Sequence, residues 1–232
     1  MPGSRVAKTR RTFCSAGLSS RASTLPSIRS TIGRAIGRAP TSSDFVHTSE
    51  QPSATASDTV QVTREGAVLV ITIDRPAVRN AIDRATSEAL ARAFDQLDAD
   101  PALTVGILTG AGGHFCTGMD LKAFLRGERV ELPGRGLAGI VQTPPVKPLI
   151  AAVEGYALAG GCEIALACDL IVASEAAQFG IPEVKRGLIA GSGGLLRLPR
   201  RIPPQIAMEL ALTGDFIDAK RAYELGFINR IV

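Results

Sequence analysis

Hydrophobic and polar residues alternate along residues 59–232 in a way that predicts strands followed by helices. Short apolar runs bounded by glycine, proline or aspartate are typical of buried strands. Such runs occupy residues 67–73, 104–110, 149–154, 170–174 and 228–232. Leu90, Phe94 and Leu97 recur at helical spacing and predict a helix over 84–97. Strands that alternate with helices indicate an α/β fold.

Capping residues mark where the predicted helices begin and end. Asp83 is placed to cap the helix over 84–97. The proline pair at 203–204 suits the first turn of a helix that extends through Leu212. Asp218 is placed to cap a short helix that stops at Gly226.

The stretch GYALAGGCEIALACD (155–169) predicts a helix that is apolar on every side, and such a helix is normally buried. Glu163 nevertheless lies in its first turn. The first N–H groups of a helix lack internal partners, and Gly160 and Gly161 leave room for a ligand, so an oxyanion could bind there. The residues alone equally allow close packing at the glycines, with Glu163 interacting favourably with the helix dipole.

Two further segments carry candidate chemistry, and each has a structural alternative. HFCTGMD (114–120) contains a glycine that can expose backbone N–H groups, or it is an ordinary turn between a strand and a helix. In FGIPEVKRG (179–187), apolar neighbours would favour the neutral form of Glu183 and suit acid–base chemistry. Alternatively, Glu183 lies in a surface turn and pairs with Lys185 or Arg186.

A glycine-rich segment, GLIAGSGGLLRLPRRI (187–202), leads into another apolar helix. Its glycine spacing matches neither a dinucleotide-binding motif nor a phosphate-binding P-loop. We therefore interpret it as a packing element or as a wall of the site.

Composition excludes several classes of function. No apolar run reaches the roughly 18 to 20 residues that a membrane-spanning helix needs. The four cysteines show no metal-binding spacing, and Cys162 and Cys168 lie within the apolar helix, where buried thiols are expected. The sequence contains only two histidines, His47 and His114, so histidine-based metal sites and Ser-His-Asp catalysis are not expected.

The net charge of +4 comes from the first 57 residues, which hold eight Lys or Arg against two acidic residues. Residues 1–57 are interpreted as a basic tail: a mitochondrial transit peptide, a disordered segment, or sequence upstream of the true start of a bacterial protein. Depending on that segment, the protein is expected in the mitochondrial matrix or the cytoplasm. Residues 58–232 are slightly acidic, so nucleic-acid binding is not expected.

Five segments, in their order and spacing, resemble the crotonase (enoyl-CoA hydratase/isomerase) superfamily over nearly all of residues 60–232. They are ITIDRPAVRNAI (71–82), HFCTGMDLKAF (114–124), PLIAAVEGYALAGGCEIALACDLIVAS (148–174), AQFGIPEVKRGLIAGSGGLLRLPR (177–200) and MELALTGDFIDAKRAYELGFINRIV (208–232). The resemblance implies a spiral of repeated ββα units. It also implies an acyl thioester of coenzyme A as ligand, without a metal or redox cofactor.

The resemblance further implies roles for individual residues. The backbone N–H groups of Met119 and Gly160 would form an oxyanion hole, and Glu163 and Glu183 would be the catalytic acid–base pair. The residues expected to bind the substrate are Met119, Asp120, Leu121, Lys122 and Gly160. Met119 stands where many hydratases have alanine, and Ala159 replaces the first glycine of a common three-glycine run.

The expected function is that of an enoyl-CoA hydratase-like lyase of fatty-acid metabolism, which adds water to trans-2-enoyl-CoA. Alternatives are an enoyl-CoA isomerase, another crotonase-type enzyme, or a non-catalytic acyl-CoA-binding or subunit-interaction protein. In the family that the chain resembles, enoyl-CoA isomerases usually lack the glutamate at the position of Glu163, so this residue favours hydration. The chain is also expected to lack the family's usual C-terminal helices. With those helices present, a homotrimer or hexamer would be expected.

Overall fold

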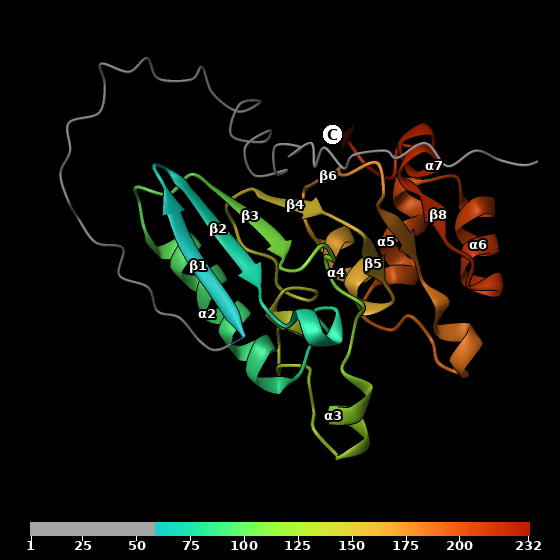
Figure 1. Ribbon diagram of the computed structural model, residues 1–232, viewed down its shortest axis with the longest axis horizontal. Helices are drawn as coiled ribbons and strands as arrows, with labels where there is room; N and C mark the ends of the chain where they lie inside the picture. Colours follow the sequence, from blue (N-terminus) through green and yellow to red (C-terminus); the bar gives the residue numbers. More distant parts are fainter. Residues whose placement is uncertain (1–58) are drawn as a thin grey trace, which may run out of the picture.

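The computed structural model describes residues 59–232 (Figure 1), so the expectations for residues 1–57 lie outside the described part of the chain. Its larger sheet has six strands in the order β1-β2-β3-β4-β6-β9. Their bounds are β1 (Val60–Glu65), β2 (Val68–Ile73), β3 (Val105–Gly110), β4 (Leu149–Val153), β6 (Leu170–Ala173) and β9 (Arg230–Ile231). β1 pairs antiparallel with β2, and the other neighbours are parallel.

A smaller sheet lies beside the first and has the order β5-β7-β8. It is made of β5 (Tyr156–Leu158), β7 (Gln178–Gly180) and β8 (Ile217–Asp218). The chain passes from β4 to β5 and then into helix α4 (Gly160–Ala167), and again from β6 to β7 and then into the 3-10 turn η3 (Pro182–Arg186) and helix α5 (Gly194–Arg201). Each turn of the spiral thus contributes one strand to each sheet before a helix.

An earlier turn of the spiral has the same plan. After β3, Cys116 forms a parallel bridge to Ala157 of β5, and helix α3 (Leu121–Leu125) follows. The predicted α/β class and the spiral of ββα units are therefore confirmed. In Figure 1 α3 projects away from the sheets, whereas α4 lies next to β5.

The remaining helices cover the sheets. Helix α2 (Arg84–Ala99) packs on β1 and β2, and α5 packs against both α4 and α6 (Pro204–Thr213). Two of the predicted caps are confirmed: Asp83 accepts a hydrogen bond from Thr86 N at the start of α2, and Asp218 accepts one from Arg221 N at the start of α7 (Ala219–Glu224). Two 3-10 turns, η1 (Pro76–Val78) and η2 (Leu137–Gly139), complete the described elements.

The apolar runs predicted β2, β3, β4 and β6 to within one residue at each end, whereas the run at 228–232 contains only the short β9. Sequence reasoning missed β1, because this edge strand is largely exposed and has polar residues where a buried strand has an apolar run. It also missed β5, β7 and β8, which are too short to show a periodicity.

Burial agrees with the apolar character of α4. Every residue from Gly160 to Leu166 is buried, and the predicted buried thiols of Cys162 and Cys168 are confirmed as free and buried. Burial raises the pKa of both thiols, so they stay protonated and unreactive near neutral pH. Among the helices of residues 59–232, none combines the length and the apolar character needed to cross a membrane.

Candidate active site

A cavity of about 500 Å³ lies between the loop after β3, the start of α4, and the chain from η3 to α5. Met119, Gly160, Glu163 and Glu183 all line this cavity, so the structure brings the four predicted catalytic and oxyanion positions together. Leu121 lines it as well.

Asp120 and Lys122, which were also predicted to bind substrate, are not among the residues that line the cavity. Asp120 instead caps α3: its Oδ1 accepts hydrogen bonds from Lys122 N (3.0 Å) and Ala123 N (3.2 Å). Burial acts to raise the pKa of the Asp120 carboxyl, but these N–H groups and the guanidinium of Arg75 outweigh it and lower the pKa. The side chain of Lys122 is exposed to solvent.

The backbone N–H of Met119 points away from the neighbouring segment that contains Ile82. Met119 forms a parallel bridge with Ile82, in which Ile82 N donates to Gly118 O and Asp120 N donates to Ile82 O, both at 2.8 Å. This pattern uses the groups on either side of Met119 and leaves its own N–H on the opposite side. Among residues 59–232 no acceptor is found for it.

Gly160 supplies a second N–H to the same place because it is the first residue of α4 and has no intrahelical partner. No acceptor for this N–H is found in the described part of the chain either. The two backbones approach closely: a Cβ atom placed on Gly160 would lie 3.6 Å from Met119 N, and one placed on Gly118 would lie 2.8 Å from Gly160 N. Two unpaired amides therefore meet at one wall of the cavity, where they can bind an oxyanion.

Glu163 is only 3% exposed, and its Oε1 accepts a hydrogen bond of 2.8 Å from the backbone N–H of Gly194. Burial raises the pKa of the Glu163 carboxyl, and hydrogen bonds from Gly194 and Ser192 reduce that effect. Gly191 and Ser192 also line the cavity, which supports the interpretation of the segment 187–202 as a wall of the site over that of a packing element alone. The orienting bond from Gly194 was missed, since nothing in the sequence relates residues 31 positions apart.

Glu183 has a buried Oε2 atom with no hydrogen-bond partner among the described residues. Burial raises the pKa of this carboxyl to about 7, and the nearby Glu163 adds to the increase. The alternative of an ion pair with Lys185 or Arg186 is not supported, because Lys185 pairs with Asp215 at 2.7 Å instead. Glu183 is thus a carboxyl that can be neutral or ionised near physiological pH.

The two glutamates influence one another across the cavity, since the charge of Glu163 is among the causes that raise the pKa of Glu183. Burial is the main cause of the raised pKa of each carboxyl, so both favour the protonated form more than an exposed glutamate does. One group can then accept a proton while the other donates one.

Sequence reasoning did not single out the basic side chains around the cavity. Arg79, Lys185 and Arg186 all line it, and the guanidinium carbon of Arg79 lies 5.5 Å from the centre of the Tyr156 ring. These cations, of which Lys185 is paired with Asp215, can bind an anionic ligand beside the glutamates Glu131, Glu163 and Glu183 that line the same cavity. The signal in the sequence was the basic residues of the segments 71–82 and 179–187, which only the fold shows to be neighbours.

Replacing Glu183 by glutamine is expected to remove a pH dependence of stability. The pKa of Glu183 in the native chain is about 7 against an ordinary value of 4.5. Between these values the unfolded chain has released a proton that the native chain still holds, so the free energy of unfolding of the wild type falls as the pH rises. This contribution is complete below the ordinary value and is lost as the pH passes through the native value.

Thermal unfolding followed by circular dichroism checks this. The melting temperature of Glu183→Gln relative to wild type should be higher at about pH 8 than at about pH 5. A difference that stays constant across this range would contradict the raised pKa.

Comparison with known proteins gives consistent results. Residues 63–232 match the model of a family described as enoyl-CoA hydratase/isomerase. Two curated relatives are carnitinyl-CoA dehydratases: that of Proteus mirabilis is 44% identical over 180 residues, and that of Salmonella typhi is 46% identical over 181 residues. In both cases the alignment covers 76% of this chain and 69% of the relative.

Solved structures are also similar. An enoyl-CoA hydratase from Mycobacterium marinum is 64% identical with a TM-score of 0.74, and the match covers 76% of this chain and 69% of the other. A carnitinyl-CoA hydratase from Mycobacterium avium is 48% identical with a TM-score of 0.73, again over 76% and 69% of the two chains.

Proposed function

Because the chain belongs to the enoyl-CoA hydratase/isomerase family, we propose that it is a lyase that adds water to trans-2-enoyl-CoA thioesters in fatty-acid metabolism. The observation that carries this proposal is the cavity where two unpaired backbone amides face two carboxyls with raised pKa values. Hydration needs these two kinds of group, because charge develops on a carbonyl oxygen while water loses a proton on bonding to C3 and C2 gains one.

In the proposed reaction the thioester oxygen accepts hydrogen bonds from Met119 N and Gly160 N. A water molecule between Glu163 and Glu183 loses one proton to the ionised carboxylate while its oxygen bonds to C3. The electron pair of the double bond moves toward the thioester, and the resulting enolate is held by the two amides. The neutral carboxyl then gives its proton to C2, which completes the 3-hydroxyacyl thioester. Each amide donor contributes about 3 kcal/mol to lowering the barrier.

The reaction leaves the oxidation level of the substrate and water together unchanged, so it requires no redox cofactor. The coenzyme A portion carries phosphates, and Arg79, Lys185 and Arg186 at the cavity supply complementary charge. The exposed Lys122, three residues after Met119 in the sequence, remains a predicted contact of this portion.

A second candidate is the hydration or dehydration of carnitinyl-type thioesters, because two curated relatives and one solved structure are named for carnitinyl-CoA. One observation favours apolar acyl groups instead. A neighbouring cavity of about 490 Å³ shares Glu183, Leu188 and Ile189 with the site, and apart from Glu183 its lining is entirely apolar. A quaternary ammonium group would find no negative charge there other than that of Glu183.

The test is an assay of the purified chain with crotonyl-CoA, a medium-chain trans-2-enoyl-CoA and crotonobetainyl-CoA, with products identified by liquid chromatography and mass spectrometry. We expect 3-hydroxyacyl products from the first two, with the gain of one water. A shifted double bond without added water would indicate an isomerase. Saturable acyl-CoA binding without any product would indicate a non-catalytic binding protein, and turnover of crotonobetainyl-CoA alone would favour the carnitinyl assignment.

A further inference from the structure

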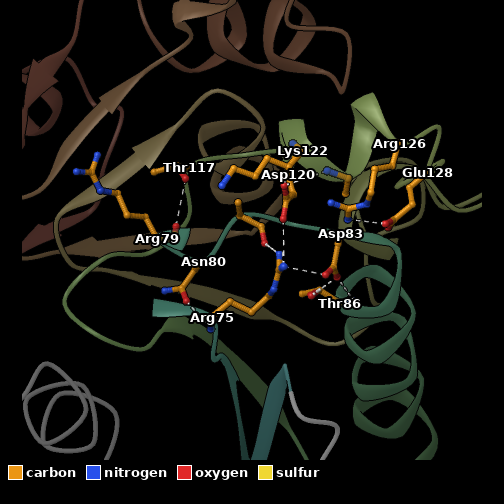
Figure 2. A network of polar contacts seen from close by, with 12 residues as sticks. Arg75, Arg79, Asn80, Asp83, Thr86, Thr117, Asp120, Lys122, Arg126 and Glu128 are labelled. Carbon is orange, nitrogen blue, oxygen red and sulfur yellow. Dashed lines mark hydrogen bonds and ion pairs between the residues drawn. The ribbon is translucent and has the colours of Figure 1, made fainter. Parts of the chain in front are cut away.

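Arg75 lies just beyond β2, and its guanidinium group connects the segment 75–83 to Asp120 (Figure 2). Its Nη2 lies 2.9 Å from Asp83 Oδ2 and 3.1 Å from Asp120 Oδ2, and its Nη1 donates a hydrogen bond to Ala81 O. The side chain is only 18% exposed, so these contacts are partly shielded from water. Arg75 does not line the active-site cavity.

Asp120 follows Met119 directly, and both of its carboxylate oxygens are engaged. Oδ1 accepts from the first N–H groups of α3, and Oδ2 faces Arg75. The backbone N–H of Asp120 donates to Ile82 O at 2.8 Å. The residue that follows the Met119 amide is therefore held by its backbone and by its side chain.

Gly118, which precedes Met119, is held by a hydrogen bond from the segment 75–83. Ile82 N donates to Gly118 O at 2.8 Å. Gly118 has a φ of +92°, a conformation that residues with a side chain rarely adopt. Because glycine has no Cβ atom, local sterics restrict its backbone little. The direction of the Met119 N–H thus depends on contacts from residues 75–83.

A buried side chain secures this segment against the loop. Asn80 is fully buried, and its Nδ2 donates to Ala111 O and His114 O at 2.8 and 2.7 Å. Its Oδ1 accepts from Arg75 N at 2.8 Å. Asn80 therefore connects the backbone of Arg75 to the loop that leads to Met119.

We propose that Arg75 is a positioning residue for hydration: through Asp120 it keeps the Met119 N–H aimed at the substrate carbonyl oxygen. The inference rests on the proposed function but concerns a residue that touches neither substrate nor water in the reaction. A planar guanidinium can bridge two carboxylates and a carbonyl at once, which a lysine ammonium on a flexible stem does less well. Without it, Asp83 and Asp120 would face each other as like charges, and repulsion would displace the residue next to Met119.

The experiment compares Arg75→Gln and Arg75→Lys with wild type and with Arg64→Gln. Arg64 is a matched control because it forms an exposed ion pair with Asp100 at 3.0 Å, outside the cavity. For each protein we would measure kcat and KM with crotonyl-CoA and the melting temperature. A fourth measurement is the absorption of a bound cinnamoyl-CoA with an electron-donating para substituent, whose band moves to longer wavelength as its carbonyl is polarised.

We expect Arg75→Gln to lower kcat about 10- to 100-fold, as misplacement of a reacting geometry does, while KM stays close to the wild-type value. The shift of the chromophore should shrink in the same variant, Arg75→Lys should recover part of both losses, and Arg64→Gln should match wild type. A merely structural role would lower the melting temperature without reducing the chromophore shift in the folded protein.

Three outcomes would overturn the proposal. They are a folded Arg75→Gln with wild-type kcat and chromophore shift, an effect on KM alone, and failure of both Arg75 variants to fold while Arg64→Gln folds. The chromophore separates this inference from the proposed function. If wild type polarises the bound thioester but hydrates no enoyl-CoA, the hydratase proposal fails, and loss of the shift in Arg75→Gln still supports the positioning role.

Discussion

Glu163→Gln and Glu183→Gln each lower kcat for enoyl-CoA hydration by roughly 10²- to 10⁴-fold, the range that general acid–base groups contribute. Glutamine has nearly the same shape as glutamate but cannot exchange a proton at neutral pH. The affinity for acyl-CoA should remain close to wild type, because the amides of Met119 and Gly160 and the basic side chains at the cavity are unchanged. Stopped-flow measurement of crotonyl-CoA hydration, with acyl-CoA binding by calorimetry, checks both parts.

The two sites should also be strongly non-additive. Since the pair handles one water together, the double variant should be little worse than the poorer single variant. Glu209→Gln, at an exposed position of α6 that does not line the cavity, is the matched control and should keep full activity. Near-normal turnover in either single variant would show that this glutamate has no part in proton transfer.

Gly161→Ala is expected to destabilise the chain by at least about 3 kcal/mol, at the upper end of the range for overpacking a core. A Cβ atom at this position would lie 2.1 Å from Cys116 O and 2.6 Å from Cys116 C. Both obstacles are backbone atoms of the loop that leads to Met119, so neither can rotate away. Either α4 or this loop would have to move, and the two amides of the site would separate.

Urea unfolding followed by circular dichroism measures this change. Gly191→Ala is a suitable control, because the nearest atom to its added Cβ would be Ile189 O at 3.8 Å. Gly160→Ala should be tolerated better than Gly161→Ala, since the closest obstacle at 2.5 Å is the flexible end of Leu137. If Gly161→Ala were as stable as wild type, the close packing of α4 against the loop would not be needed for the fold.

For the site, the sequence pattern predicted the parts but did not decide between two interpretations of them. The glycines before α4 and the carboxylate in its first turn were visible in the sequence, yet packing and anion binding remained equally possible interpretations. The resemblance to the crotonase superfamily selected the four cavity positions from these candidates. The structure added that the Oε2 atom of the half-buried Glu183 has no partner among the described residues and that Lys185 pairs with Asp215, which removes the support for a surface ion pair.

Local signals alone determined the strands β2, β3, β4 and β6 of the large sheet, the capped start of α2 and the buried helix α4. These features depend on residues within a few positions of one another, because burial of an apolar run and capping of a helix require no particular distant partner. Only the tertiary structure decided that Gly194 orients Glu163 and that Arg75 holds Asp120, contacts between residues 31 and 45 positions apart. Such pairs leave no pattern in the chain, because hydrogen bonds between distant segments are set by how the spiral stacks its turns.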